Sequence, residues 1–177
     1  QESETTTRRI LELDAGDMLK ATACATLIEA LRGEGRYREG NQVGTRLLAE
    51  GSSSFAHTIA YYEMAYNLAE MEEDLDQALD YARRSVELSP EEFKQFPLAA
   101  LGWVHYKRHE FDKAVDFLSR STEFGLSSMT LTQLGMALLA SGEEEKAKNV
   151  LSEARSLGDH SGALQERMME FMRDSTR

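Results

Sequence analysis

Apolar and small side chains recur three or four positions apart along most of the chain. A clear example runs from position 98 to 121, where such residues stand at Leu98, Leu101, Ala114 and Leu118. This spacing places them on one face of a helix, whereas a strand would alternate apolar and polar positions. Good helix formers such as Ala, Leu, Glu, Arg and Met are abundant, and only 2 prolines interrupt the 177 residues. The pattern predicts an all-α fold.

The same spacing recurs at a fixed offset of 33 residues. One copy has Leu98, Leu101, Gly102, His105, His109, Ala114, Leu118 and Ser121. The next copy has Leu131, Leu134, Gly135, Leu138, Gly142, Ala147, Leu151 and Ala154. Two earlier stretches, 24–47 and 61–90, follow the same plan less closely. A period of this size indicates a repeat architecture and therefore decides the fold.

These repeats resemble the tetratricopeptide repeat family, whose helix-turn-helix unit has about 34 residues. The resemblance covers roughly residues 20 to 157 and implies a right-handed α-solenoid of about four repeats. The ranges expected for the repeats are about 18–52, 56–90, 95–126 and 128–159.

The two ends of the chain differ from the repeats. Segment 1–17 is expected to be an N-terminal half-repeat or cap. Segment 160–177 carries an apolar helical stripe and is expected to form a C-terminal capping helix and tail. The stripe consists of Leu164, Met168, Phe171 and Met172. The same helix could instead dock onto another molecule.

The first repeat departs most from the pattern. Gly40 and Gly44 fall inside its expected second helix, where each glycine costs about 1 kcal/mol relative to alanine. We therefore expect this repeat to be the least stable.

The first helix of each later repeat carries a second apolar stripe, about 200° around the helix from the packing stripe. In the tetratricopeptide family these positions line a concave, ligand-binding groove. By that resemblance, the groove would run from a polar end at Glu29 and Arg32 to an apolar floor, with Glu63 and Gln133 at its edge. The floor would consist of Tyr62, Tyr66, Phe96, Trp103, Tyr106, Met129 and Met136. The alternative is that these side chains belong to the core, because inner helices of a solenoid touch several neighbours.

An aromatic, methionine-bearing groove suits a peptide or the apolar face of a helix. The resemblance therefore implies a non-catalytic scaffold or adaptor that binds a segment of a partner protein. Two alternatives remain open. The chain could be a structural module that self-associates through its C-terminal helix, or a peptide-sensing regulatory domain cut from a longer protein.

The formal net charge is −11. Such a chain repels nucleic acid and anionic membranes, and it favours a partner that is basic around an apolar core. No stretch approaches the roughly 20 apolar residues of a membrane-spanning helix, so we expect no membrane insertion. The single cysteine, Cys24, fits a reducing compartment, and a cytoplasmic location is expected.

Two histidines, His105 and His109, stand four positions apart, so that on a helix both would face one side as metal ligands can. The repeat alignment argues against a metal site, because His105 replaces the packing residues Leu31 and Leu138, and His109 stands at a turn. We therefore expect His105 to be a packing residue that uses one ring nitrogen for a hydrogen bond. No metal site, cofactor site or catalytic group is assigned, and the chain is not expected to be an enzyme.

Overall fold

The computed structural model describes residues 2–12 and 16–157 of the chain. Within these ranges the regular structure consists of nine α-helices and one short 3₁₀ turn. The all-α prediction is therefore confirmed. None of these helices is long and apolar enough to span a membrane.

After the first helix, α1 (Glu2–Glu12), the helices follow one another as four hairpins with short turns. The hairpins are α2 (Asp17–Gly33) with α3 (Tyr37–Glu50), α4 (Ser54–Met71) with α5 (Leu75–Leu88), α6 (Gln95–Lys107) with α7 (Phe111–Phe124), and α8 (Ser128–Ala140) with α9 (Glu144–Ser156). The 3₁₀ turn η1 (Glu91–Phe93) precedes α6. The capping helix expected over 160–177 lies outside the described residues.

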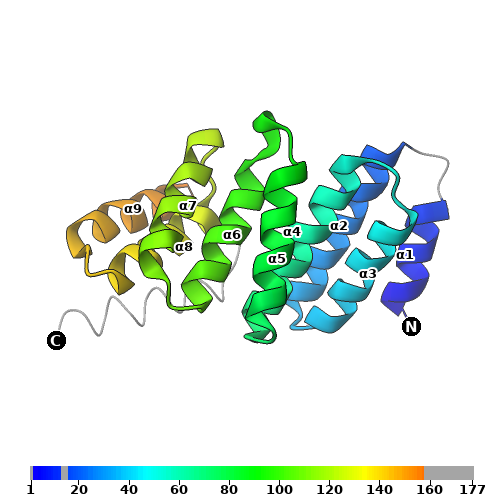
Figure 1. Ribbon diagram of the computed structural model, residues 1–177, viewed down its shortest axis with the longest axis horizontal. Helices are drawn as coiled ribbons and strands as arrows, with labels where there is room; N and C mark the ends of the chain where they lie inside the picture. Colours follow the sequence, from blue (N-terminus) through cyan, green and yellow to red (C-terminus); the bar gives the residue numbers. More distant parts are fainter. Residues whose placement is uncertain (1, 13–15, 158–177) are drawn as a thin grey trace.

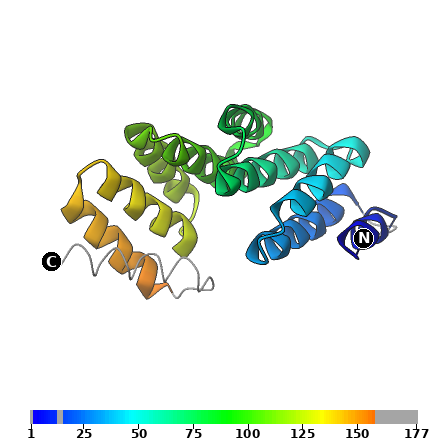
Figure 2. The same cartoon turned by 90° about the horizontal axis from the view of Figure 1, so that it is seen from below.

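The hairpins stand in a row in chain order, with α1 and α9 at opposite ends (Figure 1). Each helix from α2 to α8 packs on the next, and α1 packs on α2 and α3. The first helices of the hairpins also meet, because α4 contacts both α2 and α6. Seen from below, the row is bent, and its two ends turn toward the same side (Figure 2).

All four hairpins turn in the same way. The turn residue has a left-handed backbone in each, with φ of 73° at Gly35, 53° at Glu72, 60° at His109 and 85° at Gly142. The next backbone N–H donates to the carbonyl of the residue four positions before the turn residue, which is Leu31, Leu68, His105 or Leu138. This is the Schellman arrangement, which satisfies otherwise unpaired carbonyls at a helix end. The position that the sequence repeat marks as a turn is thus the one that needs this backbone.

The two glycines in α3 face α4 at close range. A Cβ on Gly40 would lie 2.7 Å from Asn67 Nδ2, and one on Gly44 would lie 2.6 Å from Met64 Cγ. The first hairpin therefore uses its glycines for a close helix–helix contact, which offsets part of their cost in helix propensity. Its lower stability stays a prediction.

Three of the four first helices, α4, α6 and α8, are buried nearly all round over their central residues. In α4 every residue from Thr58 to Ala69 except Tyr61 is buried, and so is every residue of α6 from Pro97 to His105. The reason is that α4 contacts α2, α3, α5 and α6 at once. The second apolar stripe of α4 thus packs largely against neighbouring first helices.

Candidate functional site

The eleven predicted groove residues differ widely in exposure. The exposed ones are Glu29, Phe96 and Met129, and those of intermediate exposure are Arg32, Tyr106 and Met136. The buried ones are Tyr62, Glu63, Tyr66, Trp103 and Gln133. The structure separates these residues into an exposed set and a core set, so they do not form one continuous open floor.

Glu63 and Gln133 were expected at the edge of the groove, but both side chains are buried. Glu63 is 1% exposed and Gln133 is 3% exposed. Glu63 lies on α4, which packs between α2 and α6. Gln133 lies on α8 and accepts a hydrogen bond from the Tyr66 hydroxyl of α4 at 3.2 Å. The packing of successive first helices thus encloses both side chains.

Trp103 belongs to the core. Its side chain is fully buried, and its indole Nε1 donates to Glu70 Oε1 at 2.7 Å. A buried tryptophan needs such a partner for its N–H. Tyr106 stacks on the indole with ring centroids 4.8 Å apart. Trp103 therefore supports the more exposed Tyr106 from beneath.

A pocket of about 390 Å³ opens beside Tyr106, and we call it the turn pocket. It is lined by Glu72, Trp103, Tyr106, Lys107, His109, Phe111 and Met136. Phe111 lies 5.7 Å from the Tyr106 ring and 5.7 Å from the His109 ring, between centroids. The α4–α5 turn, the α6–α7 turn and α8 thus contribute to one aromatic cavity.

Sequence reasoning predicted three of these lining residues, Trp103, Tyr106 and Met136. It missed the other four because they stand at or beside turns. The alignment does contain a signal, since Tyr37 and Phe111 stand two positions after the turn residue and Leu75 stands three positions after it. Only the stacking of one turn against the next brings these residues together.

The charges in the turn pocket are already paired. Lys107 Nζ donates to Glu72 Oε1 at 3.0 Å and lies 5.3 Å from the centroid of the Trp103 ring. Only 8% of the Lys107 side chain is exposed. Because this ammonium is paired with a carboxylate and rests on an aromatic face, the cavity best suits an apolar side chain.

A second group of predicted residues surrounds a buried ion pair. We call it the Glu63 cluster, and it consists of Glu29, Arg32, Tyr62, Glu63 and Phe96. Arg32 of α2 is paired with Glu63 of α4 through Nη2 and Oε2. The Arg32 guanidinium also lies 5.1 Å from the centroid of the Tyr66 ring. The ion pair ties the first hairpin to the second.

Asn67, which sequence reasoning missed, also accepts a hydrogen bond from Arg32. Its Oδ1 accepts from Arg32 Nε at 2.8 Å, and its Nδ2 donates to Asn41 Oδ1 at 3.0 Å. Asn67 is fully buried on α4. Arg32 is thus held in one orientation from two sides.

Glu63 itself is only half satisfied. Its Oε1 atom is buried without a hydrogen-bond partner among the described residues. Burial raises the pKa of Glu63 from 4.5 to about 7, against the lowering effect of Arg32 and with a further increase from Glu29. The Tyr62 ring stacks on Phe96 beside this carboxylate, with centroids 5.9 Å apart. Burial also raises the pKa of Tyr62 well above its usual value, and Glu63 and Glu29 add to that increase.

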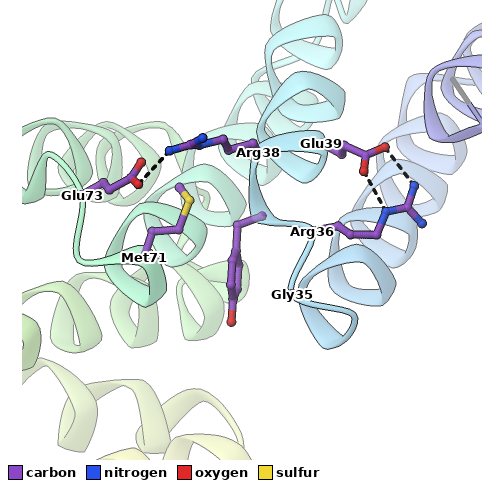
Figure 3. A pocket seen from close by; sticks show the side chains of 7 residues that line it. Gly35, Arg36, Arg38, Glu39, Met71 and Glu73 are labelled. Atoms are coloured by element: carbon purple, nitrogen blue, oxygen red, sulfur yellow. Dashed lines mark hydrogen bonds and ion pairs between the residues drawn. The ribbon is translucent and has the colours of Figure 1, made fainter.

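A second pocket, of about 290 Å³, lies between the α2–α3 turn and the end of α4 (Figure 3). Arg38 pairs with Glu73 across it at 2.9 Å, and Arg36 pairs with Glu39 at 2.8 Å. Both guanidiniums are therefore occupied by carboxylates. The Arg38–Glu73 pair is largely exposed, and such pairs contribute little to stability. Its lining includes one aromatic side chain, Tyr37, whereas the turn pocket is lined by several.

His105 and His109, the two histidines four positions apart, have separate roles in the structure. His105 is 2% exposed, its Nδ1 donates to Glu110 Oε2 at 2.9 Å, and its ring stacks on Phe117. The predicted packing histidine with one hydrogen-bonded ring nitrogen is therefore confirmed. His109 stands in the left-handed turn and lines the turn pocket.

In the part of the chain that the structure describes, no group of three or more His, Cys, Asp and Glu side chains could hold a metal ion. Cys24 is buried, and burial raises the pKa of its thiol to about 11. A thiol with such a pKa stays protonated and unreactive near neutral pH.

No family model matches the chain, and no curated protein matches it significantly. The likeness to the tetratricopeptide family therefore rests on the residues themselves.

Proposed function

We propose that this chain is a right-handed α-solenoid of four tetratricopeptide-like repeats that acts as a non-catalytic adaptor. It binds a peptide or helical segment of a partner protein. Four hairpins in chain order, with one turn geometry repeated in all of them, support this architecture. A repeat of this kind stacks on its neighbours to bury a continuous core.

The observation that carries the binding role is the turn pocket. It is a cavity of about 390 Å³ with aromatic and thioether walls, large enough for one or two apolar side chains. Tyr and Trp often dominate the energy of protein–protein contacts, and a methionine adapts to different partners. An apolar residue of the partner, seated between Tyr106, Phe111 and Met136, anchors the segment.

The net charge of the chain indicates which residues surround the apolar anchor in the bound segment. At −11, the chain attracts a segment that is basic around its apolar anchor, and long-range attraction speeds the encounter. The exposed apolar side chains of Phe96 and Met129 extend the contact surface along the first helices.

The test is to select 12-residue peptides from a random displayed library on the immobilised protein. The affinity of the enriched peptides is then measured by calorimetry. The double variant Tyr106→Ala/Met136→Ala removes two partly exposed walls of the pocket and is expected to weaken binding by about ten-fold or more. The control variants Leu88→Ala and Leu157→Ala remove exposed apolar side chains elsewhere and are expected to leave affinity unchanged.

Circular dichroism melts of each variant establish that the fold is retained. Enriched peptides that bind the double variant as tightly as the wild type would place the site outside the turn pocket. A library that yields no binding peptide would contradict the adaptor role.

A further inference from the structure

Besides Arg46 Nη1 and Thr58 Oγ1, one carboxylate oxygen, Oε1 of Glu63, is buried without a hydrogen-bond partner among the described residues. The Glu63 side chain is 1% exposed, and its Oε2 is paired with Arg32. A buried acceptor without a donor is costly, so proteins seldom leave one without a reason. A ligand that brings a donor would remove that cost.

The surroundings of Glu63 are acidic. The charged groups that act on it are Glu29 and Arg32 from α2, and the neighbouring titratable groups on α4 are the Tyr62 and Tyr66 hydroxyls. Two carboxylates therefore face one guanidinium, and the group carries one uncompensated negative charge when both are ionised. The residue that α8 contributes nearby, Gln133, is neutral.

Two side chains of the Glu63 cluster reach the surface, although the Glu63 carboxylate itself is buried. Glu29 is exposed, and Phe96 is 49% exposed and stacks on Tyr62. Lysine and arginine pack their aliphatic stems along such rings while the charged end reaches a polar group. The same rings attract a cation through their faces.

We propose that the Glu63 cluster is a subsite for one cationic side chain, a lysine or arginine of the bound segment, whose N–H groups donate to Glu63 and Glu29. This assignment rests on the adaptor role proposed above and specifies the chemistry of the partner. The cation supplies the donor that Oε1 lacks and neutralises the excess negative charge. Its stem lies along the Tyr62–Phe96 stack.

The spacing along α6 sets the distance between the two subsites. Phe96 and Tyr106 are ten residues apart on this helix, which is about 15 Å at 1.5 Å per residue. An extended segment spans that distance in about four or five residues. The partner therefore carries its basic residue about four or five positions from the apolar residue in the turn pocket.

The probe is an enriched 12-residue peptide from the library selection, synthesised with its basic residue intact and with that residue changed to glutamine. The neutral peptide is expected to bind the wild type about ten-fold more weakly, since a charge-assisted hydrogen bond is lost. Against Glu63→Gln the two peptides are expected to differ by less than about three-fold, because the carboxylate that distinguishes them is gone. Glu87→Gln, a change at an exposed glutamate of α5, serves as the control and should preserve the ten-fold difference.

The comparison of the two peptides on the wild type needs no variant, so it holds even if Glu63→Gln is poorly folded. Enriched peptides that lack basic residues, or a glutamine substitution with no effect on wild-type affinity, would overturn the cation subsite and leave the adaptor role standing. An equal loss on wild type and a folded Glu63→Gln would place the cation elsewhere. A selection without any binding peptide would remove the adaptor role and the subsite together.

Discussion

Two glutamates of this protein, the buried Glu63 and the partly exposed Glu110, pair with similar residues but differ in how fully they are satisfied. Arg32–Glu63 joins α2 to α4, and His105–Glu110 lies between the end of α6 and the start of α7. Glu110 accepts from Arg108 at 3.0 Å, from Lys113 at 2.7 Å and from His105 at 2.9 Å. Glu63 is paired with Arg32 through Oε2, and its Oε1 has no hydrogen-bond partner among the described residues.

The surroundings move the two carboxyl pKa values in opposite directions. Hydrogen bonds from Lys113 and Arg108 lower the pKa of Glu110 from 4.5 to about 2. Burial raises the pKa of Glu63 to about 7. Glu110 stands at a turn, where long basic side chains reach it through solvent, whereas Glu63 stands in the middle of a helix enclosed by others. The satisfied group secures a turn, and the unsatisfied group is the candidate subsite.

The largest difference in stability between the two groups is expected when the arginine of each is replaced. Arg32→Met leaves Glu63 without its counter-ion in the core and should lower the free energy of unfolding by about 3 to 5 kcal/mol. Arg108→Met leaves Glu110 with two other donors at a partly exposed site and should cost less than about 1 kcal/mol. Urea denaturation at pH 7.5 measures both. Equal losses in the two variants would mean that the groups do not differ as described.

The second effect is a pH dependence carried by Glu63. A carboxyl pKa raised in the folded state stabilises the protein below about pH 4.5, and that stability is lost as the pH rises through 7. A shift from 4.5 to about 7 corresponds to roughly 3 kcal/mol at most. The unfolding free energy of Glu63→Gln, minus that of the wild type, should therefore increase between pH 4.5 and 7.5.

Glu110→Gln provides the opposite pattern. Because the folded pKa of Glu110 is lowered, its contribution is present above pH 4.5 and is lost as the pH falls toward 2. The difference between Glu110→Gln and the wild type should therefore be constant above about pH 7, where His105 is neutral, and should shrink as the pH falls toward 2. Parallel curves for the two variants would contradict this assignment of pKa values.

A smaller effect is expected at His105. Leucine stands at the corresponding place in the other three hairpins, as Leu31, Leu68 and Leu138. His105→Leu should therefore change the free energy of unfolding by no more than about 1 kcal/mol, because Glu110 keeps Arg108 and Lys113. Burial lowers the pKa of His105, so wild-type stability falls as the pH drops below 6.5, and the leucine variant should lack that contribution. A loss above 3 kcal/mol in thermal or urea unfolding would assign His105 a larger role.

The smallest effect is expected at the turn next to that group. His109 has a left-handed backbone with φ of 60°, which glycine adopts without steric cost. His109→Gly should stabilise the fold by about 0.5 to 1 kcal/mol. Gly142→Ala at the equivalent turn, with φ of 85°, should destabilise it by about the same amount. Chemical denaturation of both variants gives the matched pair, and a shift of the same sign in both would argue against the shared turn geometry.

The helical content and the turn positions could be predicted from the sequence because both depend on neighbours in the chain. Apolar spacing identified the helices, and Gly35 and Gly142 marked two of the four turns. His109 and Glu72 adopt the same backbone conformation at the other two turns. The turn pocket was predicted only in part. Trp103, Tyr106 and Met136 belong to the second stripe, but Glu72 and Phe111 enter the pocket through the stacking of separate turns.

The sequence by itself thus determined that this protein is helical, where its hairpins turn, and that its first helices carry two apolar stripes. Only the tertiary structure decided which parts of the second stripe are accessible. Glu63 and Gln133 are enclosed because α4 packs between α2 and α6 and because Tyr66 reaches Gln133, 67 positions further along the chain. The physical reason is that the angle between successive hairpins sets the exposure of that stripe, and this angle results from many small contacts between helices that no single repeat contains.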